Sequence, residues 1–300
     1  PAEALHDPMK YRGITLLSVV GKLYSSILNE RLTEWVEGKG ILVEEQAGFR
    51  KKRSTVDQLF IMYELIKGRR PKETYCCFLD IQKAYDRVWR DGLWREMYKY
   101  GVRGKMWRVI KNLYKRVESC VLVDGKTTGF FTIEVGVRQG CMLSPMLFLL
   151  YINGLAEEIK RRRRGVLYGN IRISILLFAD DIVLLAENKE DLQWLMQITY
   201  EYSRKWRFLF NYDKSAVVVF DMNKKQEPII YGECKSECKC GKHWKMGEKL
   251  IIETDMYKYL GTELDTKLTF KQFKKRIADK ARKNRARVWN MGMKGGGTCQ

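Results

Sequence analysis

The sequence predicts an α+β fold, with helices in its first third and then a small, mostly antiparallel sheet with helices on one face. Two observations carry this prediction. Early apolar residues recur at three- and four-residue spacing, as on the buried face of a helix. Later apolar runs are short, and two of them lead into aspartates, as buried strands would. The 300 residues suffice for one large domain or about two.

Two helices are predicted near the N-terminus. The first covers residues 23–36, where apolar positions follow helical spacing. The second follows Ser54, which forms a capping-box pattern with Asp57 and precedes an apolar stripe that ends at Ile66. The intervening loop, residues 44–53, ends in four consecutive cations.

The middle of the chain alternates between strand and helix patterns. Residues 75–80 form a short apolar run that predicts a buried strand. Asp124-Gly125 marks a hairpin turn, within a loop longer than two residues, and Ser144-Pro145 marks the N-cap and first position of a helix. Residues 171–185 read as hydrophobic strands with two acids at a tight turn, and residues 191–206 return to helical spacing.

The charge balance indicates a polyanionic partner. Lys and Arg total 56 against 36 Asp and Glu, which gives a net charge of +20. Residues 271–294 hold ten basic residues and one acid in a helix-compatible pattern, nearly half of that excess. Nucleic acid is the first candidate partner and an anionic membrane surface the second. A hydrophobic content of 45% excludes intrinsic disorder, and no apolar stretch reaches the ~20 residues that span a membrane.

The cysteines and the N-terminus indicate an intracellular protein. Cys76 and Cys77 are adjacent in an apolar run and are predicted to be small buried hydrophobic residues rather than disulfide partners. The polar residues 1–10 do not form a signal peptide, so a reduced compartment is expected. Because the chain begins on Pro1 without Met and ends near a glycine run, we expect a fragment of a longer protein.

Three aspartates form the candidate catalytic centre. Asp180 and Asp181 lie side by side at the predicted hairpin turn, and Asp80 ends another apolar strand 100 residues earlier. Aspartate is common at solvated turns, but here both flanking strands read as buried. If the earlier strand pairs beside the hairpin, Asp80 and Asp180 face each other in an all-oxygen site suited to Mg²⁺. Two such ions can activate a 3′-hydroxyl and stabilise a leaving pyrophosphate.

These residues lie within a series of blocks that resembles a known family. Phe178-Ala179-Asp180-Asp181 resembles the catalytic hairpin of reverse transcriptases, in the form common in non-LTR (LINE-type) retrotransposons. Seven blocks follow the family's order, at residues 11–22, 46–55, 78–86, 137–145, 178–181, 211–215 and 257–261. Together they cover roughly residues 10–265, so the resemblance does not depend on the tetrapeptide.

The resemblance implies a right-hand polymerase architecture. Residues 1–265 would form fingers and palm, with the fingers mainly at 1–72 and about 90–135, and an antiparallel palm sheet packed on helices. Residues 266–300 would begin a helical thumb. The implied activity is RNA-directed DNA polymerisation, in which a DNA primer or nicked target DNA is extended on an RNA template with dNTPs. Two Mg²⁺ ions, with Mn²⁺ as an alternative, would assist the polymerisation step. The resemblance further implies a role in retrotransposition and a nuclear location, and no membrane partner is expected.

The resemblance also implies a role for individual residues. The metal ligands would be the carboxylates of Asp80 and Asp180, assisted by Asp181 and the Ile81 carbonyl. The residues expected to contact the incoming nucleotide are Arg50, Arg53, Ile81, Tyr85, Gln139 and Gly140, with Tyr85 as a steric gate against the ribose 2′-hydroxyl. Lys214 would protonate pyrophosphate, and Tyr259, Leu260 and Gly261 would form the primer grip. Lys51 and Lys52 either add to the triphosphate site or belong to a solvated basic loop.

Several alternatives stay open. The chain would also suit a group II intron-type or domesticated reverse transcriptase, or an inactive relic that binds nucleic acid. Four potential zinc ligands occur together, at Cys234, Cys238, Cys240 and His243, but their spacing also suits a cysteine-containing hairpin insertion. Residues 160–164 are all basic and suit a solvated loop, a polynucleotide contact or a nuclear-localisation patch.

Overall fold

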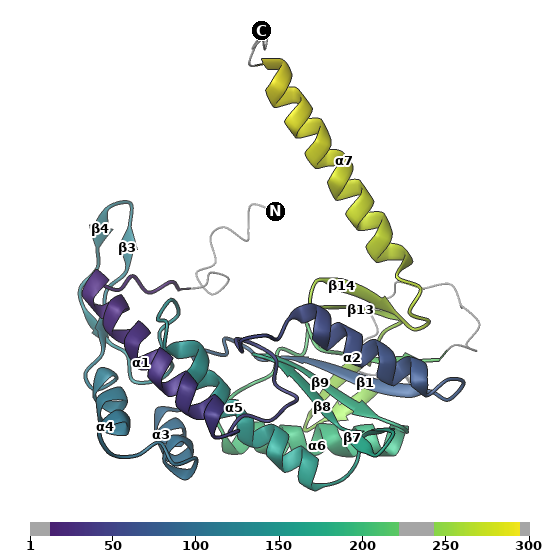
Figure 1. Ribbon diagram of the computed structural model, residues 1–300, viewed down its shortest axis with the longest axis horizontal. Helices are drawn as coiled ribbons and strands as arrows, with labels where there is room; N and C mark the ends of the chain where they lie inside the picture. Colours follow the sequence, from purple (N-terminus) through teal and green to yellow (C-terminus); the bar gives the residue numbers. More distant parts are fainter. Residues whose placement is uncertain (1–12, 222–242, 295–300) are drawn as a thin grey trace.

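The structure is a computed structural model that describes residues 13–221 and 243–294. A six-stranded sheet organises this part of the chain. The strand order is β11-β12-β10-β1-β9-β8, and β1 lies inside the sheet between β10 and β9 (Figure 1). Neighbours pair antiparallel, except for the parallel pair β10 and β12. The strands are β1 (Thr74–Asp80), β8 (Ile175–Phe178), β9 (Asp181–Ala186), β10 (Ala216–Phe220), β11 (His243–Met246) and β12 (Lys249–Glu253).

Helices cover both faces of this sheet. Side chains alternate between its faces, so Cys77 and Leu79 join one hydrophobic cluster while Cys76 and Phe78 join the other. The first cluster contains residues of α1, α3, α5 and α6, and the second contains residues of α2 (Figure 1). The helices are α1 (Val19–Gly38), α2 (Thr55–Gly68), α3 (Arg90–Lys99), α4 (Gly104–Leu113), α5 (Ser144–Arg161), α6 (Lys189–Lys205) and α7 (Lys271–Lys294).

Short hairpins complete the described fold. They pair β2 (Glu118–Ser119) with β5 (Phe131–Thr132), β3 (Leu122–Val123) with β4 (Lys126–Thr127), β6 (Val166–Tyr168) with β7 (Ile171–Ile173), and β13 (Met256–Tyr259) with β14 (Thr262–Asp265). Residues of the last hairpin pack with α2 on the second face of the sheet.

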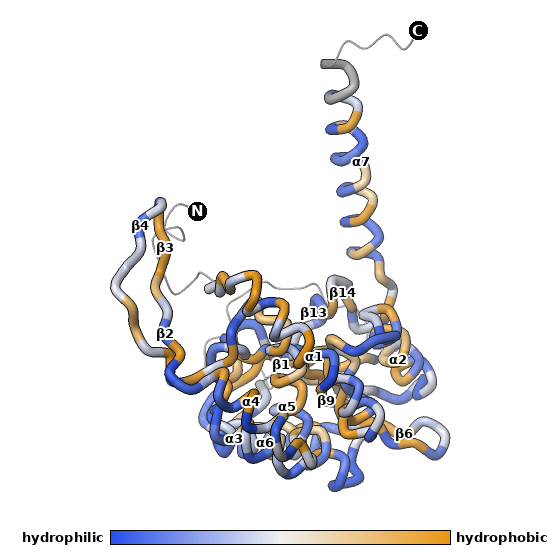
Figure 2. The backbone as a smooth tube through the Cα atoms, turned by 60° about the vertical axis from the view of Figure 1, so that its left-hand side comes forward, coloured by the Kyte–Doolittle hydropathy of each residue, from blue (hydrophilic) through white to orange (hydrophobic). Residues whose placement is uncertain are grey.

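Helix α7 leaves this hairpin and projects away from the sheet (Figures 1 and 2). The carboxylate of Asp265 accepts hydrogen bonds from the backbone N–H groups of Lys267, Thr269 and Phe270, which orders the turn into the helix. Arg276 of α7 pairs with Glu263 of β14 at 2.5 Å. Among the helices of the described residues, none has the length and apolar character needed to cross a membrane.

The structure confirms the mixed α+β class and corrects three expectations. Helices pack on both faces of the sheet rather than on one, because the side chains of its inner strands are apolar on both faces. The turn at Asp124-Gly125 contains only these two residues between β3 and β4, because both adopt positive φ (48° and 78°) and close a tight hairpin. The residue before α5 is Leu143, so Ser144 lies inside the helix, where its hydroxyl lies 3.2 Å from that of Tyr114. The proposed zinc ligands Cys234, Cys238 and Cys240, and the side chain of His243, lie outside the described residues.

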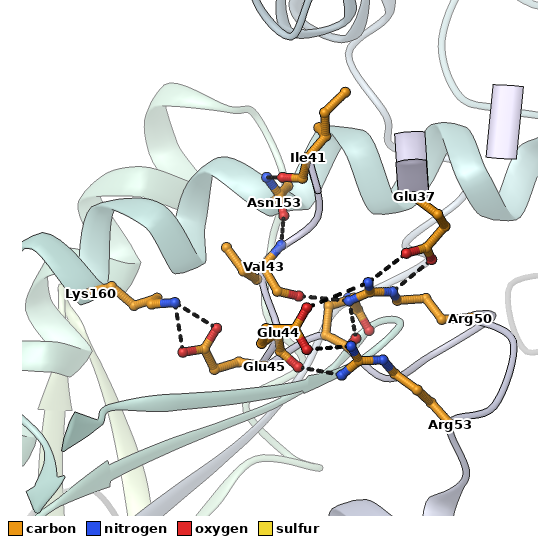
Figure 3. A network of polar contacts seen from close by, with 10 residues as sticks. Glu37, Ile41, Val43, Glu44, Glu45, Arg50, Arg53, Asn153 and Lys160 are labelled. Carbon is orange, nitrogen blue, oxygen red and sulfur yellow. Dashed lines mark hydrogen bonds and ion pairs between the residues drawn. The ribbon is translucent and has the colours of Figure 1, made fainter. Parts of the chain in front are cut away.

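Asn153 on α5 attaches the loop after α1 to the helix that supports the sheet (Figure 3). Its Oδ1 accepts the N–H of Val43 at 2.9 Å, and its Nδ2 donates to the carbonyl of Ile41 at 3.1 Å. The same Nδ2 lies within 3.2 Å of the Tyr100 hydroxyl and 3.0 Å of a Glu157 oxygen. A single buried amide therefore satisfies the hydrogen-bonding needs of two backbone groups of this loop, the N–H of Val43 and the carbonyl of Ile41.

We expect Asn153→Ala to lower the free energy of unfolding by about 2 kcal/mol, because it leaves buried backbone groups without partners. Asn170→Ala, at an exposed position in the turn between β6 and β7, is the control and should change it by less than about 0.5 kcal/mol. Urea denaturation measures both. Equal losses in the two variants would contradict the role assigned to Asn153.

Candidate active site

The pairing of β1 with β9 brings the three aspartates to one end of the sheet. Asp80 is the last residue of β1 and lies opposite Asp181, the first residue of β9. Asp180 lies in the turn from β8, after Ala179, which has a positive φ of 57°. The direct partner of Asp80 across the strands is therefore Asp181, one position along from the expected Asp180.

The carboxyl group of Asp181 resists ionisation. Burial, followed by repulsion from Asp180 and Asp80, raises the pKa of Asp181 to about 6. All three side chains supply oxygen ligands, as Mg²⁺ prefers, and their repulsion would be relieved by a bound cation. In the described ranges, no three His, Cys, Asp or Glu side chains converge closely enough to form a ready-made metal site. The donor chemistry thus fits a divalent ion, although the ligands are not yet gathered around one.

The segment 211–215 lies directly beside Asp80. The backbone N–H of Asn211 donates to the Asp80 carbonyl at 2.8 Å, and the Ser215 hydroxyl accepts the Asp80 N–H at 3.3 Å. Lys214 has an exposed side chain, and its carbonyl accepts the Tyr257 hydroxyl at 2.8 Å. An ammonium group is therefore attached to the same backbone segment that positions the first aspartate.

The β13–β14 hairpin lies against the same strands. Tyr257 stacks on Phe78 of β1 with ring centroids 4.4 Å apart. Burial first, and then the charges of Asp181 and Asp80, raise the pKa of Tyr257 to about 12. Tyr259 is buried against Phe78, whereas Leu260 and Gly261 form the hairpin turn with φ values of 45° and 84°. Of the predicted primer-grip residues, Tyr259 is thus a buried strand end, and Leu260 and Gly261 form a more exposed turn.

Tyr85 lies on the other side of the aspartates. Its ring stacks on Phe148 of α5 at 5.4 Å and 16°. Burial raises the pKa of Tyr85, and the negative charge of Asp180 raises it further. The Tyr85 hydroxyl therefore lies within the electrostatic influence of the turn aspartate. Ile81 is buried and forms a β-bridge with Phe210, so its backbone position directly after Asp80 is fixed.

Gln139 and Gly140 lie in a loop held next to the segment of Tyr85. The Gln139 side-chain amide donates to the Asp86 carboxylate at 3.0 Å, and the Gln139 main-chain carbonyl accepts the N–H of Thr15 at 2.8 Å. Gly140 has a φ of 98°, and a Cβ there would lie 3.0 Å from the Thr15 carbonyl oxygen. The close approach explains the glycine at this position.

Gln46 connects the loop after α1 to the β8–β9 hairpin, whose turn contains Asp180. Its buried Oε1 accepts the backbone N–H of Ala179 at 2.9 Å and that of Gly48 at 2.8 Å. A Cβ on Gly48 would lie 2.2 Å from the Ala179 nitrogen, so no side chain fits there. Leu177 of β8 adds backbone hydrogen bonds to both neighbours of Gln46 at 2.9 Å. The residue that precedes the paired aspartates is therefore positioned by a distant loop.

Arg50 differs from its expected role in triphosphate binding. Its guanidinium makes paired hydrogen bonds to Glu37 at 2.8 and 2.6 Å and donates to the carbonyls of Val43 and Gln46 (Figure 3). Only 5% of the side chain is exposed. In this structure Arg50 therefore holds the shape of the loop rather than presenting a free cation.

The remaining cations of the loop are more accessible. Lys51 and Lys52 are exposed, whereas Arg53 pairs with Glu44 and is 28% exposed. The hydrogen bond from Arg53 lowers the pKa of Glu44. An open pocket of about 420 Å³ is lined by Glu37, Ala47, Arg50, Lys51, Lys52, Arg53, Asp57, Gln58 and Ile61. Two exposed lysines, neither of which forms an ion pair with a described residue, thus line a cavity next to the loop.

Sequence reasoning missed the supporting roles of Gln46, Gln58 and Asn153. The Gln58 amide donates to the carbonyls of Glu45 and Leu177 at 3.1 Å each, which adds a second polar link from loop to hairpin. All three are buried amides. For Gln58 and Asn153, an amide within an apolar helical stripe was the available signal, whereas Gln46 lies in a loop and offered no such signal. The partners of all three amides are set by tertiary contacts.

Comparison with known proteins decides the family. Residues 5–264 match the family described as Reverse transcriptase (RNA-dependent DNA polymerase). The chain belongs to this family. Its relatives include proteins from mobile elements, and it is the reverse transcriptase domain of a non-LTR retrotransposon type. Reverse transcriptases depend on divalent metal ions, and carboxylates lie together where β1 ends and β9 begins.

The relatives are distant but match over nearly the whole chain. The reverse transcriptase domain is 28% identical over 296 residues to a probable RNA-directed DNA polymerase from transposon X-element of Drosophila melanogaster, covering 96% of this chain and 30% of that protein. It is also 28% identical to the RNA-directed DNA polymerase from mobile element jockey of Drosophila funebris, covering 91% of this chain and 28% of the relative. The chain thus spans less than a third of these relatives.

A solved structure supports the fold. The structure of telomerase from Candida tropicalis, in complex with a fragment of telomeric RNA, superposes with a TM-score of 0.52 at 12% identity. The match covers 84% of the reverse transcriptase domain and 37% of that chain. At this identity the likeness concerns the fold alone, an α+β polymerase fold.

Asp181→Asn is expected to stabilise the metal-free reverse transcriptase domain at pH 7.5 by about 1 kcal/mol, a value reduced for solvent screening. The raised pKa means that the folded state binds this proton more tightly than the unfolded chain. Wild-type stability should therefore fall as pH rises from about 4 to 6, and the variant should lack this loss. Urea denaturation in EDTA at pH 4.5 and 7.5 measures the free energy of unfolding of both proteins. Asp213→Asn, at an exposed position, is the control; a destabilised Asp181→Asn variant would contradict the repulsion.

Gln46→Met should lower kcat about 10- to 100-fold, because the Ala179 N–H loses its acceptor and the aspartate turn shifts. The KM for dNTP should stay nearly constant. Gln46→Glu keeps the acceptor oxygen and should retain most of the wild-type rate. Steady-state kinetics and amide exchange at Ala179 measure both effects. Equal kcat and exchange in wild type and Gln46→Met would show that this hydrogen bond does not position the turn.

Proposed function

We propose that the protein extends a DNA primer on an RNA template with deoxynucleoside triphosphates and releases pyrophosphate. The observation that carries this proposal is the strand register that places Asp80 opposite Asp181, with Asp180 in the adjoining turn. Family membership supports the reaction class, and the surrounding elements would position each substrate. Catalysis would then consist mainly of positioning and charge neutralisation.

The proposed architecture is a right hand. The six-stranded sheet with α5 and α6 would be the palm, while the residues up to 72 and about 90–135 would form most of the fingers. The α7 helix would begin the thumb, since it leaves the sheet at the β13–β14 hairpin and carries the basic segment. Its exposed cations suit the phosphates of a template–primer duplex.

Different residues would contact the incoming nucleotide and the primer. Lys51 and Lys52 line the open pocket and would contact the triphosphate, with Arg53 beside them and Arg50 holding the loop. Tyr85, fixed against Phe148, would exclude the ribose 2′-hydroxyl. Gln139 and Gly140 would border the new base pair. The turn of Leu260 and Gly261, after Tyr259, would hold the primer end, and Lys214 would donate a proton to pyrophosphate.

Asp80, Asp180 and Asp181, with the Ile81 carbonyl, would hold the divalent ions, and Mg²⁺ is the proposed metal, with Mn²⁺ as an alternative. When bound, the ions would supply positive charge at the 3′-oxygen and the leaving pyrophosphate. The repulsion that raises the pKa of Asp181 supports this assignment, because cation binding removes it.

The proposed partners are an RNA template, a DNA primer or nicked target DNA, and dNTPs, in retrotransposition within the nucleus. The names of the relatives from transposons support this context. A group II intron-type or domesticated enzyme would share the same centre, and an inactive relic would share only the binding surfaces.

Primer extension tests the proposal. With poly(rA)·oligo(dT), dTTP and Mg²⁺, the wild-type chain should incorporate nucleotide, and Asp180→Asn should reduce the rate about 100- to 1,000-fold. Asp213→Asn, an exposed carboxylate of the neighbouring segment, is the matched control and should stay within two- to three-fold of wild type. Equal rates for wild type and Asp180→Asn, or no incorporation by the wild type, would overturn the proposal for this chain.

A further inference from the structure

Helix α4 presents a row of cations on its outward face. Ile110 is buried, and Met106 and Val109 pack against the same core, which fixes one face of the helix inward. Lys105, Arg108 and Lys111 are exposed on the remaining surface. The three-residue spacing keeps these ammonium and guanidinium groups on neighbouring turns.

This segment lacks compensating acids. Residues 97–117 contain seven Lys and Arg residues and no Asp or Glu. Lys99 pairs with Glu96 and Glu157, but Arg103 and the three α4 cations form no ion pair with any described residue. By contrast, Arg161 and Arg162 at the end of α5 both pair with Glu158. The α4 cations therefore keep their charge available to a partner.

Aromatic rings lie among these cations. Tyr98 and Trp107 meet edge to face at 6.3 Å, and Tyr98 is 52% exposed. The guanidinium of Arg103 lies 4.6 Å from the Tyr98 ring, and the ammonium of Lys111 lies 4.7 Å from the Trp107 ring. Trp107 is half-buried against the core and supports the exposed Tyr98. Cations beside an exposed ring are a combination by which proteins hold single-stranded nucleic acids, through phosphates and stacked bases.

The surface continues from Lys111 into an open pocket of about 570 Å³. Trp89 and Trp94 line this pocket, and Arg207 lies 4.3 Å over the Trp89 ring. A second cation–aromatic pair therefore extends the same surface beyond α4. The α3–α4 side lies at the opposite end of the molecule from α7 (Figures 1 and 2).

We propose that the α4 patch, formed by Tyr98, Arg103, Lys105, Trp107, Arg108 and Lys111, binds a single-stranded polynucleotide outside the polymerase centre. The cations would contact phosphates, and Tyr98 would stack on a base. Duplexes fit this chemistry less well, because their bases are already stacked on one another. The α4 patch binds whether or not the aspartates catalyse polymerisation.

The test measures binding of labelled 20-residue oligo(U) and oligo(dU) by fluorescence anisotropy, with unlabelled RNA–DNA hybrid in excess to fill the polymerase centre. Replacing Lys105, Arg108 and Lys111 together by Ala should weaken binding of both oligonucleotides at least about 10-fold at 50 mM salt. The slope of log affinity against log salt should fall by about 2, since three phosphate contacts are lost. Affinity for the hybrid itself should change less than about three-fold.

The matched control replaces Arg161, Arg162 and Arg163 together by Ala, which removes the same charge elsewhere and should leave the salt slope unchanged. Tyr98→Ala should weaken oligonucleotide binding about 5-fold or more, whereas Tyr98→Phe should retain it. Equal weakening by the two triple variants, or an α4 variant that loses hybrid and single strand alike, would overturn the proposal. So would binding of the patch to phosphatidylserine vesicles in place of oligonucleotides.

Discussion

The antiparallel pairing of β1 with β9 is the constraint on which the rest of the structure depends. It places Asp80 opposite Asp181 and therefore brings together carboxylates that repel one another. The pairing persists because β1 lies inside the sheet between β9 and β10, and Cys76 and Cys77 are completely buried. Apolar burial along two strands thus offsets an unfavourable charge arrangement at their end, as is common at catalytic sites.

The β8–β9 hairpin, which carries Asp180 and Asp181, also depends on polar contacts from far along the chain. Its turn contains Ala179 at positive φ, a conformation that costs about 1 kcal/mol or more for a non-glycine residue. The Gln46 amide accepts the N–H of that residue, and Asn153 in turn fixes the loop that carries Gln46. Helix α5, loop and hairpin are consequently coupled through buried amides, so a distant polar substitution can disturb the aspartates.

Local patterns predicted much of the fold and the location of the three aspartates at a strand end and a tight turn. The apolar stripe and capping box anticipated α2, and the basic segment anticipated α7 at residues 271–294. The aspartates followed from apolar runs that end on acids. Arg50 could not be understood in this way, because its partner Glu37 belongs to the preceding helix and the cationic run suggested a free charge. Buried amides such as Gln46 are likewise defined only once strands and loops meet.

The excess of positive charge takes on a different meaning when each cation is considered with its partners. The Arg50 guanidinium makes hydrogen bonds inside the protein, and Arg276 forms an ion pair that connects α7 to β14. Such cations stabilise the fold and add little to the field outside it. The exposed cations of α4, which form no ion pair with the residues that the structure describes, and those of α7 remain accessible. Because these two helices lie at opposite ends of the molecule, one polynucleotide duplex held by α7 would leave α4 free. A single strand that continues beyond the duplex is the polyanion that can satisfy both surfaces at once.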